Sequence, residues 1–163
     1  MKKITTIVVA LTVMASVAYA EQLSDTGSLT ISGTVDKMVR IAVTPTGNEN
    51  LDLTADVTDH SVASINEYSN VVSGYTVQVE SANSWKLVGQ NNDDELEYTA
   101  AYDGDGVATS AATAMITDAS DRTGGRGTID GVNKAFAISY DAATANLYND
   151  YYEDTLTFTI TAK

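Results

Sequence analysis

The sequence predicts an all-β fold, an antiparallel β-sandwich in one compact domain. Apolar residues recur at every second position in several short runs, which is the pattern of strands with one buried face. Clusters of Gly, Asn and Asp separate these runs, as turns between antiparallel strands require. No stretch carries a convincing apolar stripe of a helix over about 11 residues or more. These patterns favour two antiparallel sheets that each bury one face.

The alternating runs follow one another along the chain, with turn residues between them. Strands are expected at 28–35, 39–43, 51–53, 75–80, 85–88, 96–102, 136–140 and 156–160. Turns are expected at 46–48, 91–94, 103–106 and 122–127. The segment Ala108–Met115 mixes Ala with Thr and Ser, which favours a weak strand or a loop over a helix. We find no internal repeat, linker or second domain.

The first 20 residues have the three regions of an export signal. Lys2 and Lys3 give a positive start, residues 4–17 form an uncharged apolar run, and Ala18-Tyr19-Ala20 is a small-x-small cleavage motif. The apolar run is shorter than the ~20 residues of a membrane-spanning helix. We therefore expect cleavage after Ala20 and an exported chain with no integral membrane segment.

The composition of the mature chain limits its partners. Loss of Lys2 and Lys3 changes the formal net charge from −13 to −15, because 22 Asp+Glu then face 7 Lys+Arg. So acidic a surface repels nucleic acid and anionic lipid, and we expect no nucleic-acid partner. The chain has no Cys, so neither a lipid anchor nor a disulfide can form and the core must hold the fold unaided.

The residues offer little for catalysis. His60 is the only histidine, and it lies in the polar segment 56–61, which we expect to be a surface loop. Cysteine nucleophiles and Cys/His metal sites are absent by composition. Every carboxylate that the pattern places falls in a turn or on an outward strand position. We therefore expect no enzyme and no cofactor; a hydrolase that depends on His60 is the distant alternative.

One acidic turn is a weak candidate for calcium. Asp103 and Asp105 stand two residues apart between flexible glycines, as in oxygen-rich cation loops. The loop lacks the bidentate Glu of an EF-hand, since Ala114 stands at the twelfth position. Asp-Gly is also a strong hairpin signal, and the turn is the preferred interpretation.

The two ends of the mature chain carry the most regular strands. Near the start, Leu29, Ile31, Gly33 and Val35 share one face, behind a short polar leader. The chain closes on a second regular strand, whose apolar face consists of Leu156, Phe158 and Ile160. Periodicity alone leaves open whether the first strand pairs within its own domain or with another molecule.

A family resemblance rests on the order of these motifs. They are Gly-Thr-Val at 33–35, Val-Thr-Pro at 43–45, Leu-Asp-Leu at 51–53, Gly-Tyr-Thr-Val-Gln-Val at 74–79, Leu-Glu-Tyr-Thr at 96–99 and Tyr-x-Asp-Thr-Leu-Thr-Phe-Thr-Ile at 152–160. In this order the mature chain resembles the spore coat protein U domain and the archaic and alternative chaperone–usher pilin subunits. The last motif is the most specific. Many members have a cysteine in the second strand, where this chain has Val39.

The resemblance implies an immunoglobulin-like sandwich that lacks its last strand, which the next subunit supplies by donor-strand exchange. It implies a signal peptide at 1–20, a donor extension at 21–36 and a pilin domain at 37–163. The donor residues would be Leu29, Ile31, Gly33 and Val35, and the groove would be lined by Leu156, Phe158 and Ile160. Implied partners are like subunits, a periplasmic chaperone and an outer-membrane usher. The implied role is a surface fimbria in adhesion or biofilm formation, with the chain as a shaft or minor adaptor subunit.

A second hypothesis is a secreted monomeric β-sandwich that binds a glycan or a protein. It depends on the tyrosines Tyr148, Tyr151 and Tyr152, which cluster just before the last strand. Aromatic rings at loop positions stack on sugars, although next to a strand they also fill the rim of a core. The isolated mature chain separates the hypotheses, since the binder would stay a stable monomer.

Overall fold

The computed structural model describes residues 25–123, 131–143 and 145–163. The predicted signal peptide therefore lies outside the described residues. Every element of regular secondary structure in these residues is a β-strand, and the strands pair antiparallel. None of these residues forms a helix long and apolar enough to cross a membrane. The chain divides into two units, before Val35 and from Val35 onward, which are described separately below.

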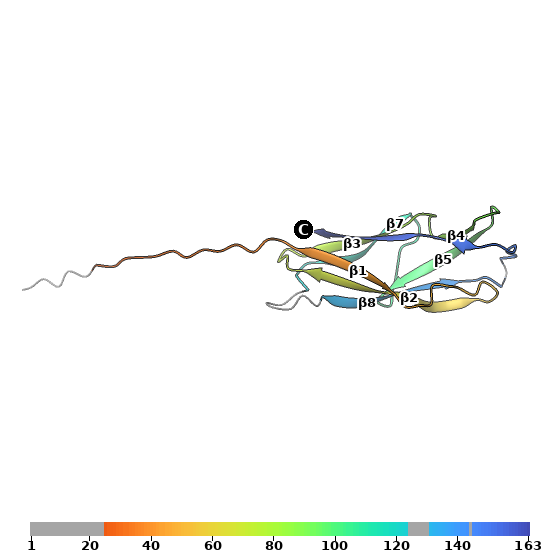
Figure 1. Cartoon of the computed structure of the whole chain (residues 1–163), viewed down its shortest axis with the longest axis horizontal. Coiled ribbons are helices and arrows are strands. Elements are labelled where there is room, and N and C mark those ends of the chain that lie inside the picture. The colour runs from red at the N-terminus through yellow and green to blue at the C-terminus, as the bar shows by residue number, and fades with distance from the viewer. Residues whose placement is uncertain (1–24, 124–130, 144) are drawn as a thin grey trace, which may run out of the picture. The chain divides into compact units, whose positions relative to one another are not determined.

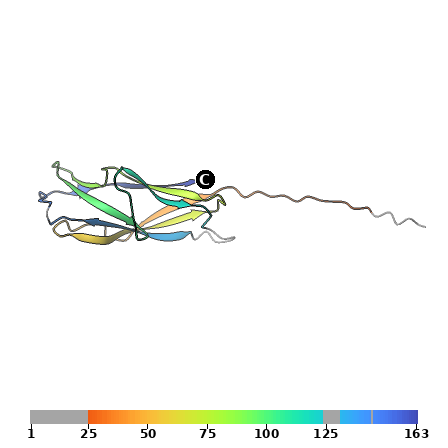
Figure 2. The ribbon, with the colours of Figure 1, turned by 180° about the vertical axis from the view of Figure 1, so that it is seen from behind.

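The strands from Val35 onward form two sheets (Figures 1 and 2). They are β1 (Val39–Pro45), β2 (Val57–Ser69), β3 (Tyr75–Ser81), β4 (Lys86–Gly89), β5 (Glu95–Tyr102), β6 (Asp105–Gly106), β7 (Thr113–Ala119), β8 (Val132–Tyr140), β9 (Tyr152–Glu153) and β10 (Leu156–Ala162). The larger sheet has the order β1-β2-β8-β5-β4-β9, with β6 beside β5, and the smaller has the order β10-β3-β7. The prediction of an all-β protein with antiparallel sheets is confirmed, and the arrangement is consistent with a β-sandwich.

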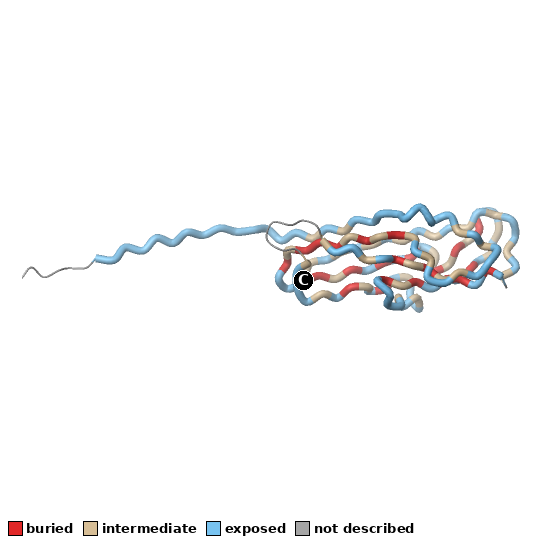
Figure 3. Tube along the Cα trace, turned by 90° about the horizontal axis from the view of Figure 1, so that it is seen from below, coloured by how far each residue is buried: buried red, intermediate tan, exposed pale blue. Residues whose placement is uncertain are grey.

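The core lies between the two sheets, and strands such as β3 and β5 place every second residue in it (Figure 3). Ile65 on β2, Val79 on β3 and Phe136 on β8 are completely buried. Trp85 precedes β4, is also buried, and packs edge-on against Tyr98 at a ring distance of 6.0 Å. Alternation of this kind places one face of each strand in the core without any disulfide.

Two sequence predictions about strands from Val35 onward were wrong. The segment 56–61, expected as a loop, belongs largely to β2, which was not predicted at all. Its alternation is broken by register shifts between Val57 and His60 and between Ser61 and Ala63, where β2 pairs with β8. Such bulges hide a strand from a period-two search. Conversely, 51–53 forms no strand, and Asp52 instead accepts hydrogen bonds from the backbone and hydroxyl of Thr54.

One carboxylate that the sequence pattern did not place is buried, unlike those expected in turns or on outward strand positions. The Glu67 side chain on β2 is fully buried, and the Lys134 ammonium lies 3.2 Å from it. The hydroxyls of Tyr75, Tyr102 and Thr117 donate to the same carboxylate at 2.9, 2.5 and 2.7 Å. Every oxygen is thereby satisfied, as a buried charge requires. Glu67 was missed because an Asn-Glu-Tyr segment gives no sign of its inward direction.

The directions of β1 and β10 define two opposite ends of the domain. Lys37 donates from its ammonium to the Lys163 carbonyl at 3.1 Å, so the start of β1 and the end of β10 lie together at what we call the proximal end. The C terminus marks this end in Figure 1. The loops 46–56 and 90–94 and the loop region 141–155, which includes the short strand β9, form the opposite, distal end. β10 therefore runs from distal to proximal, and β1 runs the other way.

Candidate functional site

Both sheets end on the same side of the domain with an unpaired edge. Among the described residues, β1 is the edge strand of the larger sheet and pairs only with β2, whereas β10 is the edge strand of the smaller sheet and pairs only with β3. β1 and β10 approach within 8 Å between Cα atoms. Across the part of the chain that the structure describes, no backbone hydrogen bond joins them. The backbone groups along these edges are therefore available to another strand.

The apolar side chains on this side are only partly covered. Leu156, Phe158 and Ile160 of β10 point toward the core but are half-buried. On β1, Val43 remains 46% exposed. A sandwich normally buries such inward positions from both sheets, so the two edges leave a strip of core open to solvent.

A cavity of about 230 Å³ lies between the two edges and is mainly apolar. Val43 and Pro45 of β1 form one wall, and Leu156 and Phe158 of β10 form the other. Phe136 lies at its floor and packs edge-on against Phe158 at 5.3 Å between ring centres. We call this cavity, together with the open edge of β10, the edge groove. The predicted groove residues Leu156 and Phe158 line the cavity, whereas Ile160 lies further along the same face of β10.

The predicted donor segment forms no strand in the single chain, which corrects the expectation for 28–35. Residues 25–38 have no regular structure. Leu29, Ile31 and Val35 are 85%, 87% and 89% exposed, and a Cβ added at Gly33 would meet nothing within 4 Å. A strand exists only with a partner for its ladder, and no partner strand is assigned to this segment. The segment therefore exposes three large apolar side chains at alternating positions, which is unusual for a chain surface.

Asp154 holds the end of the edge groove in place. Its carboxylate accepts hydrogen bonds from the Ser81 hydroxyl at 2.6 Å and the Tyr98 hydroxyl at 2.5 Å. It also accepts from the backbone of Asn83 at 3.0 Å. These bonds tie the start of β10 to the turn before Trp85. Trp85 itself has the unusual φ of 65°. The Tyr-x-Asp-Thr motif therefore has a structural role, and that motif was the signal by which Asp154 could have been found.

A second cavity, of about 870 Å³, lies at the distal end and adjoins the edge groove. We call it the distal cavity. Loops 49–54 and 147–154 line it, and Glu49, Leu51, Leu87 and Asp154 line both cavities. Of the three clustered tyrosines, Tyr148 and Tyr151 are 73% and 61% exposed. Tyr152 instead donates its hydroxyl to the Tyr148 carbonyl at 2.9 Å.

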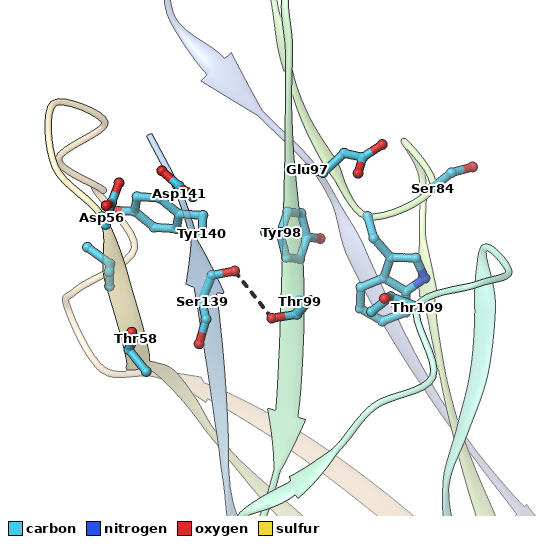
Figure 4. A pocket seen from close by; sticks show the side chains of 12 residues that line it. Asp56, Thr58, Ser84, Glu97, Tyr98, Thr99, Thr109, Ser139, Tyr140 and Asp141 are labelled. Atoms are coloured by element: carbon cyan, nitrogen blue, oxygen red, sulfur yellow. Dashed lines mark hydrogen bonds between the residues drawn. The ribbon is translucent and has the colours of Figure 1, made fainter. Parts of the chain in front are cut away.

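A polar depression of about 590 Å³ lies across β2, β8 and β5 (Figure 4). Thr58, Ser139 and Thr99 contribute hydroxyl groups, and Asp56 and Asp141 contribute carboxylates. A backbone hydrogen bond from Ala143 lowers the pKa of Asp56, so this group stays ionised near neutral pH. No histidine or cysteine lines the depression, so it offers no nucleophile with a neighbouring imidazole base.

The remaining candidate residues have structural surroundings. His60 lies on β2, with its Nε2 atom 2.9 Å from the Asn48 carbonyl. Asp103 and Gly104 have φ values of 53° and 90° and connect the paired residues Tyr102 and Asp105. This is the two-residue hairpin turn that Asp-Gly favours. Within the described ranges, no group of three or more His, Cys, Asp or Glu could hold a metal ion.

The sequence was compared with known proteins. It matches no protein-family model, and no curated protein is similar to it.

Proposed function

We propose that this chain is an exported structural subunit of a surface fimbria, in which subunits join by donor-strand exchange. The supporting observation is that one chain contains both a groove without a covering strand and an apolar segment without a strand partner. The edge groove exposes a strip of core and the unpaired backbone of β10. The segment 29–35 exposes an alternating apolar face with no strand partner. Each feature supplies what the other lacks. In this proposal the sandwich is immunoglobulin-like and lacks its last strand.

The side-chain sizes favour one register. The inward positions of β10 are Leu156, Phe158, Ile160 and Ala162, which match the four donor positions in number. Antiparallel insertion sets Val35 opposite Leu156, Gly33 opposite Phe158, Ile31 opposite Ile160 and Leu29 opposite Ala162. The residue without a side chain then faces the largest one, and the smallest groove residue faces a leucine. Each of the three apolar donor side chains contributes roughly 1.5–3 kcal/mol on full burial.

The direction of insertion also decides what kind of assembly forms. An antiparallel donor has Val35 at the distal end of the acceptor, so the donor's own domain continues beyond that end through Asp36. Its own edge groove then remains free for a third subunit, and an open head-to-tail fibre grows. A parallel donor would bring two proximal ends together and allow a closed reciprocal pair. Antiparallel pairing within both sheets of the domain supports the fibre.

Cells that express fimbriae provide the test. Deletion of residues 21–35, or Ile31→Asp, should abolish the fibres seen by electron microscopy, because a charge at this position would be buried in the groove. The matched control is Thr30→Asp, which places the same charge on the opposite face of the segment and should leave fibres unchanged. Fibres that persist with Ile31→Asp would rule out the donor role.

A second candidate is a secreted monomer that binds a glycan. The exposure of Tyr148 and Tyr151 beside the distal cavity favours it, since flat aromatic faces stack on sugar rings. The mature chain, expressed alone, should then remain a monomer at high concentration. Concentration-dependent polymers would support the fimbrial subunit instead.

A further inference from the structure

The distal cavity continues the edge groove at the point where a donor strand would leave it. Glu49, Leu51, Leu87 and Asp154 line both spaces, so the two spaces adjoin. The donor residue Val35, placed beside Leu156, would stand at this junction. Whatever follows Val35 in the neighbouring subunit must therefore pass the distal cavity.

Chain length fixes which residue arrives there. Lys37 follows Val35 by two residues, and two residues span at most about 7 Å. In its own domain, Lys37 is exposed and lies on a braced segment. The Asn70 side chain accepts from the Met38 backbone at 2.7 Å and donates to the Asp36 carbonyl at 2.9 Å. The proximal end thus presents Lys37 from a defined position. Its ammonium has three donors, of which one bonds the Lys163 carbonyl.

The distal end is strongly acidic. Loop 46–56 has three Asp or Glu, 90–94 has two and 141–155 has four, and none of these loops contains Lys or Arg. Glu49 and Glu153 are exposed and line the distal cavity. Asp150 is held by the side chain and backbone of Asn91, which lower its pKa, so the loop around it is ordered and charged. The proximal end, by contrast, carries Lys37 and Lys163, and of these Lys163 is already paired with Asp118.

We propose that the distal cavity is a docking site for a second copy of this chain, which inserts Lys37 between Glu49 and Glu153. This inference rests on the proposed donor-strand exchange. The contact adds a charge pair to each junction and opposes head-to-head contact, because two acidic distal ends repel each other. The apolar residues Leu51 and Leu53 in the cavity accommodate the lysine stem.

The test is a charge swap in polymers of the mature chain. Lys37→Glu alone and Glu153→Lys alone should each shorten the half-life of the polymers at elevated temperature by roughly two- to fivefold, the range expected for one exposed ion pair. The two changes together should restore the half-life. All differences should shrink between ~20 mM and ~500 mM NaCl, because salt screens exposed charges. Lys86→Glu is the control and should leave the half-life unchanged, because Lys86 on β4 pairs with Glu95 of its own domain.

A separate readout reports donor-strand insertion itself. The pair Val35→Cys and Leu156→Cys should give a ladder of disulfide-linked chains in a protein that has no native cysteine. A ladder accompanied by unchanged half-lives in the single variants would overturn the docking site alone. Half-lives that fall in both single variants and stay low in the double variant would overturn the specific contact between Lys37 and Glu153. Loss of the ladder would overturn donor-strand exchange and, with it, the docking site.

Discussion

Two neighbouring strands of the smaller sheet, β3 and β10, have the same alternating pattern but very different burial. They pair along their whole length, from Leu156 opposite Ser81 to Ala162 opposite Tyr75. Val77 and Val79 of β3 are 0% exposed, whereas the inward residues of β10 are half-buried. β3 has a strand on each side and β10 has one. The number of neighbours, and not the strand's own residues, decides how much core it completes.

The largest difference should appear between two phenylalanines that contact each other. In a monomeric Ile31→Asp host, Phe136→Ala should lower the free energy of unfolding by about 3–5 kcal/mol, since Phe136 is completely buried. Phe158→Ala should cost about 1–1.5 kcal/mol there, because the Phe158 side chain is only partly buried. Urea unfolding measures both. In polymers the cost of Phe158→Ala should approach that of Phe136→Ala; equal costs in the monomer would show that the edge is already closed.

The stability of the fully covered core around β2 and β8 should depend strongly on its buried ion pair. Lys134→Met would leave the Glu67 carboxylate buried without its cation and should cost about 3 kcal/mol, at the low end for buried pairs because Lys134 is partly exposed. Adding Glu67→Gln should recover part of this loss. Urea unfolding of the single and double variants tests the coupling, and purely additive effects would contradict it.

At the end of the edge groove, Asp154→Ala should lower the free energy of unfolding by about 1–3 kcal/mol. The change leaves the Ser81 and Tyr98 hydroxyls without an acceptor. The turn before Trp85 should also become more susceptible to proteolysis. The exposed neighbour gives the control, since in the monomeric Ile31→Asp host Glu153→Ala should change neither stability nor cleavage. Equal behaviour of the two variants would remove the role assigned to the Tyr-x-Asp motif.

The smallest expected effect is a pH dependence of stability, and it comes from the tyrosines bonded to Glu67. Burial, followed by the hydrogen bond to Glu67, raises the pKa of Tyr102, and the same causes raise the pKa of Tyr75. The folded state then holds these protons more tightly than the unfolded chain. Their contribution is complete below the unfolded value of about 10 and is lost as pH rises above it. Unfolding measured between about pH 8 and 11 should show the decline, and Tyr102→Phe should reduce its slope.

The sequence was informative where one face of a strand is buried and the alternation is unbroken. β1, β3, β5, β8 and β10 were predicted for this reason, and the Asp-Gly hairpin followed from local turn chemistry. β2 was missed because its bulges break the alternation at Asp59, whose φ is 51°. Glu67 was missed because its inward direction depends on cross-strand partners that lie 35 and 67 residues away in the chain, at Tyr102 and Lys134.

The candidate site was predictable only in part. The apolar faces of 29–35 and 156–160 were visible from period two. The cavity walls from β1 and the distal loops were not, because they arise from the positions of two sheet edges relative to each other. Strand prediction for 29–35 failed because a strand needs a neighbour for its ladder, and no strand of the described residues pairs with this segment.

Cross-linking tests most directly the claim that 29–35 of one copy completes β10 of another. The chain has no cysteine, so the only disulfides in the Val35→Cys/Leu156→Cys variant are the engineered ones. Directly opposite positions on antiparallel strands bring Cβ atoms to about 4.5–5.5 Å, close enough for a bond after small adjustments. Non-reducing gels should show a ladder of covalent multimers, and Val35→Cys/Ala162→Cys should show none. A cross-linked product that migrates only as a monomer, or a ladder only from the second pair, would contradict antiparallel exchange between subunits.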